Sequence, residues 1–178
     1  NGCQLMMRGE GFTLLNWIEA VEAHSEDRPW FAILKAWAFA LNGYLDRVES
    51  ALRPVDRFVS SSTPNLKMKI MLGSMAAVRA YLANMRGDSD QAIAFAQQAL
   101  GYLPDRVPFA RSLRSLATSI LGDASWLNGD LETAREAYTE AVRIGRAAGN
   151  IHLTIIANSH IAETLIEQGQ LHTAARTF

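Results

Sequence analysis

The chain has 178 residues, of which 49% are hydrophobic and 20% charged, and its formal net charge at pH 7 is −1. This composition is ordinary for a soluble folded protein, and it excludes the strong basic footprint that nucleic-acid binding requires. The single cysteine, Cys3, excludes an intrachain disulfide and fits a reducing, cytoplasmic setting. No apolar run has the length of a membrane span, so contact with a membrane is not expected.

Apolar residues recur at spacings of three and four along most of the chain, as on one face of a helix. The predicted helices outside the central hairpin cover residues 12–24, 29–42, 45–59, 64–86, 89–101, 151–168 and 171–178. Pro54 is expected to kink or split the third of these helices. Thr63 is expected to cap the fourth, with Pro64 at its first helical position.

The clearest supersecondary unit lies between Leu113 and Gly149. One apolar stripe ends before the Gly129-Asp130 pair and a second begins at Leu131. A link of about three residues requires the two helices to fold back antiparallel. Asp130 suits the N-cap of the second helix, and Gly149 suits its C-terminal stop.

This hairpin recurs with a period of about 40 residues. Gly43, Gly87, Gly129 and Gly169 occupy equivalent places. Small or β-branched residues stand at fixed spacings in sequence from these glycines. One set lies before the glycines, namely Ala36, Ala80, Gly122 and Ala162. Two sets lie after them, namely Val48, Ala92, Ala134 and Ala174, and then Val55, Ala99 and Ala141. Such residues suit helices that approach closely. The sequence therefore predicts an all-α helical-repeat solenoid, with residues 1–178 forming one domain that is a piece of a longer array.

Parts of the pattern resemble known families. Leu121-Gly122, Ala134, Tyr138 and Ala141 stand where the tetratricopeptide consensus has its Leu-Gly, Ala, aromatic and Ala residues. The N-terminal part resembles the sensor region of the large ATP-dependent LuxR-type, MalT-like transcription regulators. The matching segments are Gly9-Glu10-Gly11, Leu14-Leu15-Asn16-Trp17-Ile18-Glu19-Ala20, Arg28-Pro29, Ala36-Trp37-Ala38 and Leu41-Asn42-Gly43. The resemblance implies degenerate tetratricopeptide repeats, with a nucleotide-binding domain upstream and a DNA-binding domain downstream of this chain.

The resemblance also implies a binding groove, because the first helix of each pair lines the concave face of such arrays. The expected ligand-binding residues are Tyr81, Asn84, Ser119, Asp123, Trp126, Ser159 and Glu163. The same face is expected to include Trp30, Ile33, Trp37, Ser74 and Ala77. Aromatic rings beside hydroxyl, amide and carboxylate groups suit a polar organic ligand or a peptide. The alternative is that the aromatic residues are core and the polar groups are merely solvated.

Catalytic and cofactor motifs are not found in the sequence. Neither GxxxxGK[ST] nor GxGxxG occurs, so no nucleotide cofactor is expected. His160 and Glu163 are one turn apart, but a metal needs three or four converging ligands, which favours a solvated pair. Met68, Met71, Met75 and Met85 are favoured as core over an adaptable binding surface. The chain is therefore not expected to be an enzyme or to hold a metal.

The functional prediction is a sensor module whose groove binds a small-molecule inducer or a regulatory protein and biases a neighbouring ATPase. The alternative is a stand-alone tetratricopeptide-like scaffold for protein–protein interaction. Direct contact with nucleic acid is not expected. Self-association through one end of the array is expected from apolar residues at that end, namely Leu165, Ile166, Leu171 and Phe178.

Overall fold

The computed structural model describes residues 5, 8, 10–21, 29–60 and 65–177. The helices of this part are α2 (Gly11–Val21), α3 (Pro29–Leu41), α4 (Val48–Ser60), α5 (Leu66–Met85), α6 (Ser89–Tyr102), α7 (Pro108–Leu127), α8 (Leu131–Ala148), α9 (Ile151–Glu167) and α10 (Leu171–Ala174). The described residues contain no β-strand, and the all-α prediction is confirmed. Within these ranges, no helix combines the length and the apolar character needed to cross a bilayer.

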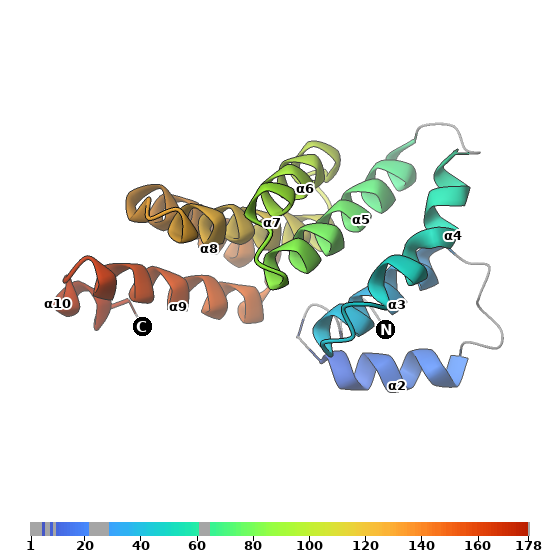
Figure 1. Ribbon diagram of the computed structural model, residues 1–178, viewed down its shortest axis with the longest axis horizontal. Helices are drawn as coiled ribbons and strands as arrows, with labels where there is room; N and C mark the ends of the chain where they lie inside the picture. Colours follow the sequence, from blue (N-terminus) through green and yellow to red (C-terminus); the bar gives the residue numbers. More distant parts are fainter. Residues whose placement is uncertain (1–4, 6–7, 9, 22–28, 61–64, 178) are drawn as a thin grey trace.

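The helices form antiparallel pairs that stack in chain order. The pairs are α3 with α4, α5 with α6, α7 with α8, and α9 with α10, and Figure 1 shows them running from one end of the long axis to the other. The first helices of successive pairs also contact each other, α3 with α5, α5 with α7, and α7 with α9. The first helices therefore form a continuous row, and the helical-repeat solenoid is confirmed.

Each first helix ends in the same kind of turn. Gly43, Gly87, Gly129 and Gly169 have φ values of +79°, +73°, +78° and +75°. This left-handed conformation costs a residue with a Cβ about 1–2 kcal/mol and costs glycine almost nothing. The glycines thus let the chain leave one helix and enter its antiparallel partner in the same way four times.

Small residues occupy the helix–helix contacts of every repeat. All eleven of the residues that keep a fixed distance from the turn glycines are buried. Gly122 of α7 shows how little room is left, because a Cβ added there would lie 2.6 Å from Cε1 of Tyr138 on α8. The repeat register inferred from the sequence is the register of the packed structure.

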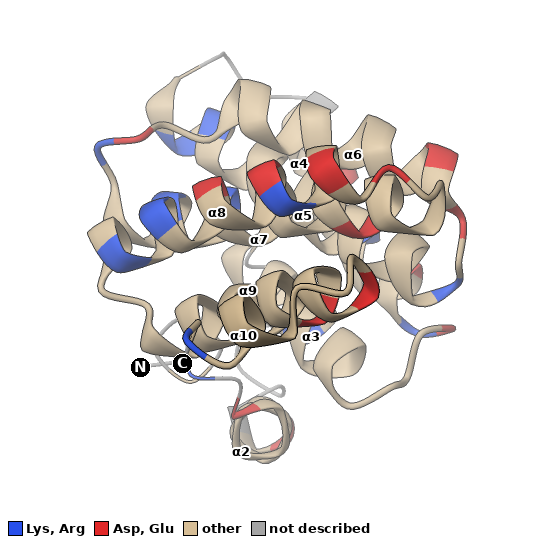
Figure 2. Cartoon of the chain, turned by 90° about the vertical axis from the view of Figure 1, so that its left-hand side faces the viewer, with Lys and Arg blue, Asp and Glu red and all other residues tan. Residues whose placement is uncertain are grey.

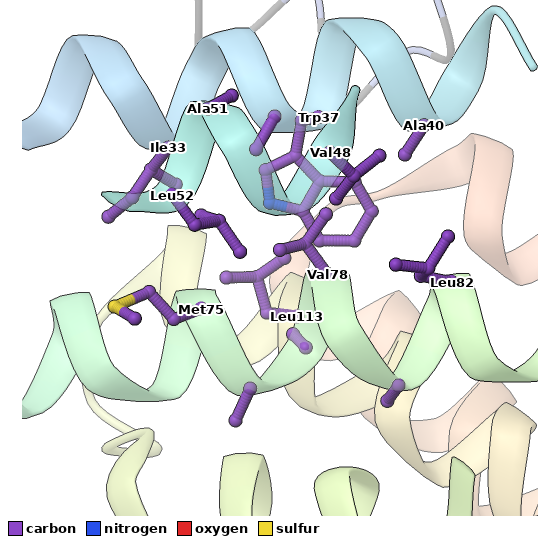
Figure 3. Close-up of a cluster of buried hydrophobic side chains, with 14 of the residues drawn as sticks. Ile33, Trp37, Ala40, Val48, Ala51, Leu52, Met75, Val78, Leu82 and Leu113 are labelled. Carbon is purple, nitrogen blue, oxygen red and sulfur yellow. The ribbon is translucent and has the colours of Figure 1, made fainter. Parts of the chain in front are cut away.

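Trp37 joins the first two pairs of helices. Its side chain is 2% exposed, and it projects from α3 among Val48 and Leu52 of α4 and Val78 of α5 (Figure 3). A buried indole of this size contributes several kcal/mol by removing apolar surface from water, at about 25 cal/mol per Å². Trp37 thereby holds α3 and α4 against α5.

Three residues that we expected on the concave face are instead core. Ile33, Ser74 and Ala77 are completely buried and line neither of the cavities described below, so their assignment to the groove was wrong. The Ser74 hydroxyl donates to the Ile70 carbonyl oxygen at 2.7 Å, which satisfies it without a ligand. The helices α3 and α5 are packed on more than one side, and helical spacing alone does not distinguish a core face from a groove face.

The start of α5 differs from the sequence prediction, and α4 is one helix rather than two. Asn65, not Thr63, caps α5, since its side-chain oxygen accepts the Met68 N–H at 2.9 Å; Thr63 and Pro64 lie outside the described residues. Pro54 does not split α4, which continues from Val48 to Ser60. Because Pro54 has no N–H, the Ser50 carbonyl oxygen lacks its hydrogen-bond donor in the helix. Ser50 is exposed, so water can donate in place of the missing N–H.

The apolar residues near the C-terminal end do not form one exposed surface. Leu165 is only 5% exposed and is sealed within the chain, so its assignment to a self-association surface was wrong. Ile166 and Leu171 are 52% and 64% exposed, whereas Phe178 lies outside the described residues. Self-association through this end stays a prediction that rests on Ile166 and Leu171.

The contact between Gly122 and Tyr138 yields a stability prediction. Gly122→Ala should lower the free energy of unfolding by about 1–3 kcal/mol, because the ring must move to admit the methyl group. Gly101→Ala is the matched control: Gly101 lies in α6, is exposed, and has open space around it. That substitution should raise stability by roughly 0.5–1 kcal/mol through higher helix propensity. Urea denaturation followed by circular dichroism measures both, and equal shifts would contradict the tight contact.

Candidate ligand-binding groove

The first helices of four successive pairs enclose a cavity of about 300 Å³. Its walls are Trp37 and Leu41 of α3, Tyr81, Asn84 and Met85 of α5, Ser112, Leu113, Leu116, Ser119, Ile120 and Asp123 of α7, and Asn150, His152, Leu153, Ile156 and His160 at the start and along α9. None of these lining residues belongs to α4, α6 or α8 among the described helices. The cavity therefore lies on the face formed by the row of first helices.

Two parallel helices give this cavity its length. The residues from Ser112 to Asp123 lie on one face of α7 and extend over about 16 Å, at 1.5 Å per residue. Asn150 and His160 bound a stretch of similar length, about 15 Å, along α9. The cavity is thus an elongated trough between α7 and α9, and α3 and α5 close its other side.

A second cavity of about 290 Å³ adjoins the first. The two share Asn84, Met85, Asp123 and His160, and the second adds Trp126, Leu127, Tyr138, Glu163 and Thr164. Because the four shared side chains lie between them, the two cavities form one groove with a polar middle. We call this pair of cavities the groove.

Asp123 is the centre of a hydrogen-bond network at the middle of the groove. Its Oδ2 accepts from Nδ2 of Asn84 at 2.7 Å, and its Oδ1 accepts from the Tyr138 hydroxyl at 2.8 Å. The Tyr138 ring stacks on His160 with ring centroids 5.0 Å apart and an interplanar angle of 18°. Nδ1 of His160 lies 3.3 Å from Oε2 of Glu163. The network connects α5, α7, α8 and α9, so it spans three consecutive repeats.

The environment of the tyrosines keeps them protonated. Burial raises the pKa of Tyr138 above its ordinary value of about 10, and the Asp123 carboxylate raises that pKa further through its charge and its hydrogen bond. Burial likewise raises the pKa of Tyr81. Near neutral pH, Tyr138 is therefore a hydrogen-bond donor to Asp123, and both rings offer uncharged surfaces to the groove.

Two buried N–H groups on residues that line the first cavity have no hydrogen-bond partner among the described residues. They are Nε1 of Trp37 and Nδ2 of Asn150, on side chains that are 2% and 3% exposed. The other end of the Asn150 amide is occupied, because its Oδ1 caps α9 by accepting the Leu153 N–H at 3.1 Å. An unpaired buried donor costs about 1–3 kcal/mol. Because both nitrogen atoms are themselves buried, an occupant of the cavity could accept from them only after the side chains moved.

The structure brings six of the seven expected site residues together. Tyr81, Asn84, Ser119 and Asp123 line the first cavity, and Asn84, Asp123, Trp126 and Glu163 line the second. Ser159 lines neither, and its hydroxyl donates to the Ile155 carbonyl oxygen at 3.2 Å. In the described chain no further first helix packs beside α9, so Ser159 lacks the opposing wall that encloses Ser119. Ligand binding by these residues stays a prediction.

The sequence analysis missed several residues of the groove. Tyr138 was assigned only to the repeat consensus, His160 only to a solvated pair with Glu163, and His152 and Asn150 to no site. Three of the four methionines are core as expected, but Met85 is 52% exposed and lines both cavities. Among the described residues, no group of three or more side chains converges as metal ligands.

One position of the repeat would have identified the residues that run along the length of the site. Trp37, Tyr81, Asp123 and Glu163 all stand six residues before a turn glycine. Each lines the groove, from the first cavity to the second. The four residues at this position therefore form a row across the four first helices, which we call the ladder. Along the array, the ladder changes from aromatic to acidic side chains.

A row of parallel first helices, backed by second helices and joined by left-handed glycine turns, defines an α-solenoid of the tetratricopeptide type. The sequence model of the MalT-like TPR region matches residues 73–178. The chain belongs to this family, which confirms the resemblance recognised in its sequence motifs.

Similar proteins extend the match toward the N-terminus. The chain is 28% identical over 160 residues to the HTH-type transcriptional regulator MalT of Yersinia enterocolitica serotype O:8 / biotype 1B, and equally to that of Yersinia pestis (strain Pestoides F). These alignments cover 84% of the chain but only 16% of each relative. The chain thus spans a small part of the length of the curated relatives it matches. No solved structure is significantly similar to it.

The network around Asp123 can be measured as a coupling energy. Asp123→Ala should lower the free energy of unfolding by about 1–3 kcal/mol, because Asn84 and the buried Tyr138 hydroxyl lose their acceptor. In a double-mutant cycle with Tyr138→Phe, the coupling should be about 0.5–3 kcal/mol. Ser159→Ala is the control and should change stability by less than about 0.5 kcal/mol, since its hydroxyl bonds only its own helix. Additive effects of the Asp123 and Tyr138 substitutions would contradict the network.

Proposed function

We propose that the chain is the sensor region of a MalT-like, HTH-type transcription regulator and that an effector binds in the groove. The observation that carries the proposal is a cavity of about 300 Å³ whose walls come from four successive first helices. Cavities of this size, mostly apolar with a few convergent polar groups, are typical of small-molecule sites. The match to HTH-type transcriptional regulators supports the regulatory role.

The groove offers a physical route from binding to regulation. An occupant that contacts α3, α5, α7 and α9 together touches four repeats, so its affinity depends on how these repeats are placed relative to one another. The hydrogen bonds from Asn84 and Tyr138 to Asp123 depend on the same placement. An effector that fits one curvature of the array better than another shifts the population toward it, by an amount set by its differential affinity. The neighbouring domains would sense that shift.

A regulatory protein is the other kind of effector that this surface suits. Met85, Trp126 and Leu127 are 52%, 38% and 54% exposed and gather around the second cavity. Exposed apolar side chains beside a hollow are a common feature of protein-binding sites. This observation also supports the alternative function, a stand-alone scaffold for protein–protein interaction. Direct nucleic-acid contact is not proposed, because the chain has no net positive charge.

The groove is tested by effector titration of the full-length protein. After a thermal-shift screen of small molecules, isothermal titration of a confirmed effector should show at least a roughly tenfold loss of affinity in Asp123→Ala and in Trp126→Ala. Trp17→Ala is the matched control, because Trp17 is 39% exposed, close to the 38% of Trp126, but lies on α2 away from both cavities. It should leave the affinity unchanged.

Two results would decide against the proposal. Equal affinities in wild type, Asp123→Ala and Trp126→Ala would dismiss the groove as the effector site. The sequences that flank the chain in the complete protein separate regulator from scaffold. A phosphate-binding P-loop before the chain and a helix-turn-helix after it support the regulator, whereas their absence from the complete protein leaves the scaffold.

A further inference from the structure

We infer that the groove is selective for a small organic amine, whose apolar body lies in the first cavity and whose ammonium group lies beside Asp123. The inference rests on the proposed function, since it names the chemical class of the effector. It stands on the distribution of aromatic and acidic groups along the groove.

The ladder of groove residues six positions before the turn glycines is aromatic at one end and acidic at the other. Trp37 and Tyr81 form the aromatic end, with their ring centroids 5.9 Å apart. Asp123 and Glu163 form the acidic end, and both line the second cavity. A ligand that spans this ladder places an apolar group against the rings and a positive group against the carboxylates.

The charge of Asp123 has no cationic partner among the described residues. Its two oxygens accept only from neutral donors, the Asn84 amide and the Tyr138 hydroxyl. A carboxylate has about four lone-pair sites, so it retains acceptor capacity for an ammonium group. A cationic ligand would supply the counter-ion that the described residues do not.

The rest of the groove strengthens the preference for a cation. Neither cavity has a lysine or arginine among its described lining residues. The helix α9 contains no Lys or Arg, and Figure 2 shows its ribbon tan apart from its acidic residues, Glu163 and Glu167. An anion would find only His152 and His160 as basic groups in the groove, whereas a cation finds the half-buried Asp123 carboxylate and the more exposed Glu163 carboxylate.

Four small probes separate these features in titrations of the full-length protein. Tyramine has a hydroxyl, an aromatic body and an ammonium group. 4-(2-Hydroxyethyl)phenol replaces the amine with a neutral alcohol, 3-(4-hydroxyphenyl)propionate replaces it with an anion, and 2-phenylethylamine lacks the phenolic hydroxyl. Tyramine and 2-phenylethylamine should both bind at least tenfold more tightly than the alcohol and the anion.

Two matched substitutions of aspartate by asparagine assign the preference to its residue. Asp123→Asn should abolish the preference for tyramine over the neutral alcohol. Asp130→Asn is the control, because Asp130 caps α8 outside both cavities and asparagine caps a helix equally well. It should keep the full preference for tyramine.

The possible results separate this inference from the proposed function. Equal or tighter binding of the alcohol or the anion, no binding of any probe at millimolar concentration, or loss of the preference in Asp130→Asn would each overturn the amine inference. The groove itself is judged separately, by the loss of affinity for a confirmed effector in Trp126→Ala relative to Trp17→Ala.

Discussion

The structure depends on the close approach of helices at positions that hold only small residues. Gly122 leaves no space for a methyl group beside Tyr138, and Ala36 and Ala80, which stand at the same position of their repeats, are completely buried. Dispersion and the exclusion of water stabilise such contacts only when the surfaces fit closely. Because the same contact recurs in each repeat, the first helices lie parallel in a row, and that row forms the groove.

The same close approach places polar groups between repeats. Asp123 can accept from Asn84 and Tyr138 because α5, α7 and α8 meet at its side chain. Buried polar groups stabilise a structure only when they are paired, so this network favours one arrangement of the three helices over others. A change at the groove that disturbs Asp123 therefore acts on the packing of adjacent repeats as well as on a ligand.

The groove combines apolar walls with a few polar groups, as binding sites for small molecules do. Its polar groups are amides, hydroxyls, carboxylates and two imidazoles, and its middle is shared by two cavities. The chain belongs to the MalT-like TPR region family. In a repeat array each unit contacts only its neighbours, so an occupant that spans several units can alter the whole curvature. The proposed effector site and the proposed regulatory role thus rest on one architecture.

The sequence by itself determined the fold class, the helix pairs and the repeat register. These follow from local chemistry: the 3.6-residue period, the left-handed turn at Gly129, and small residues such as Ala134 at fixed offsets. Only the tertiary structure decided which faces became groove and which became core. Ser74 lines neither cavity and Ser119 lines the first, although both are small, buried polar residues of first helices. The difference arises because a residue's surroundings are set by neighbouring repeats some 40 residues away, and helical spacing within one segment contains no information about those neighbours.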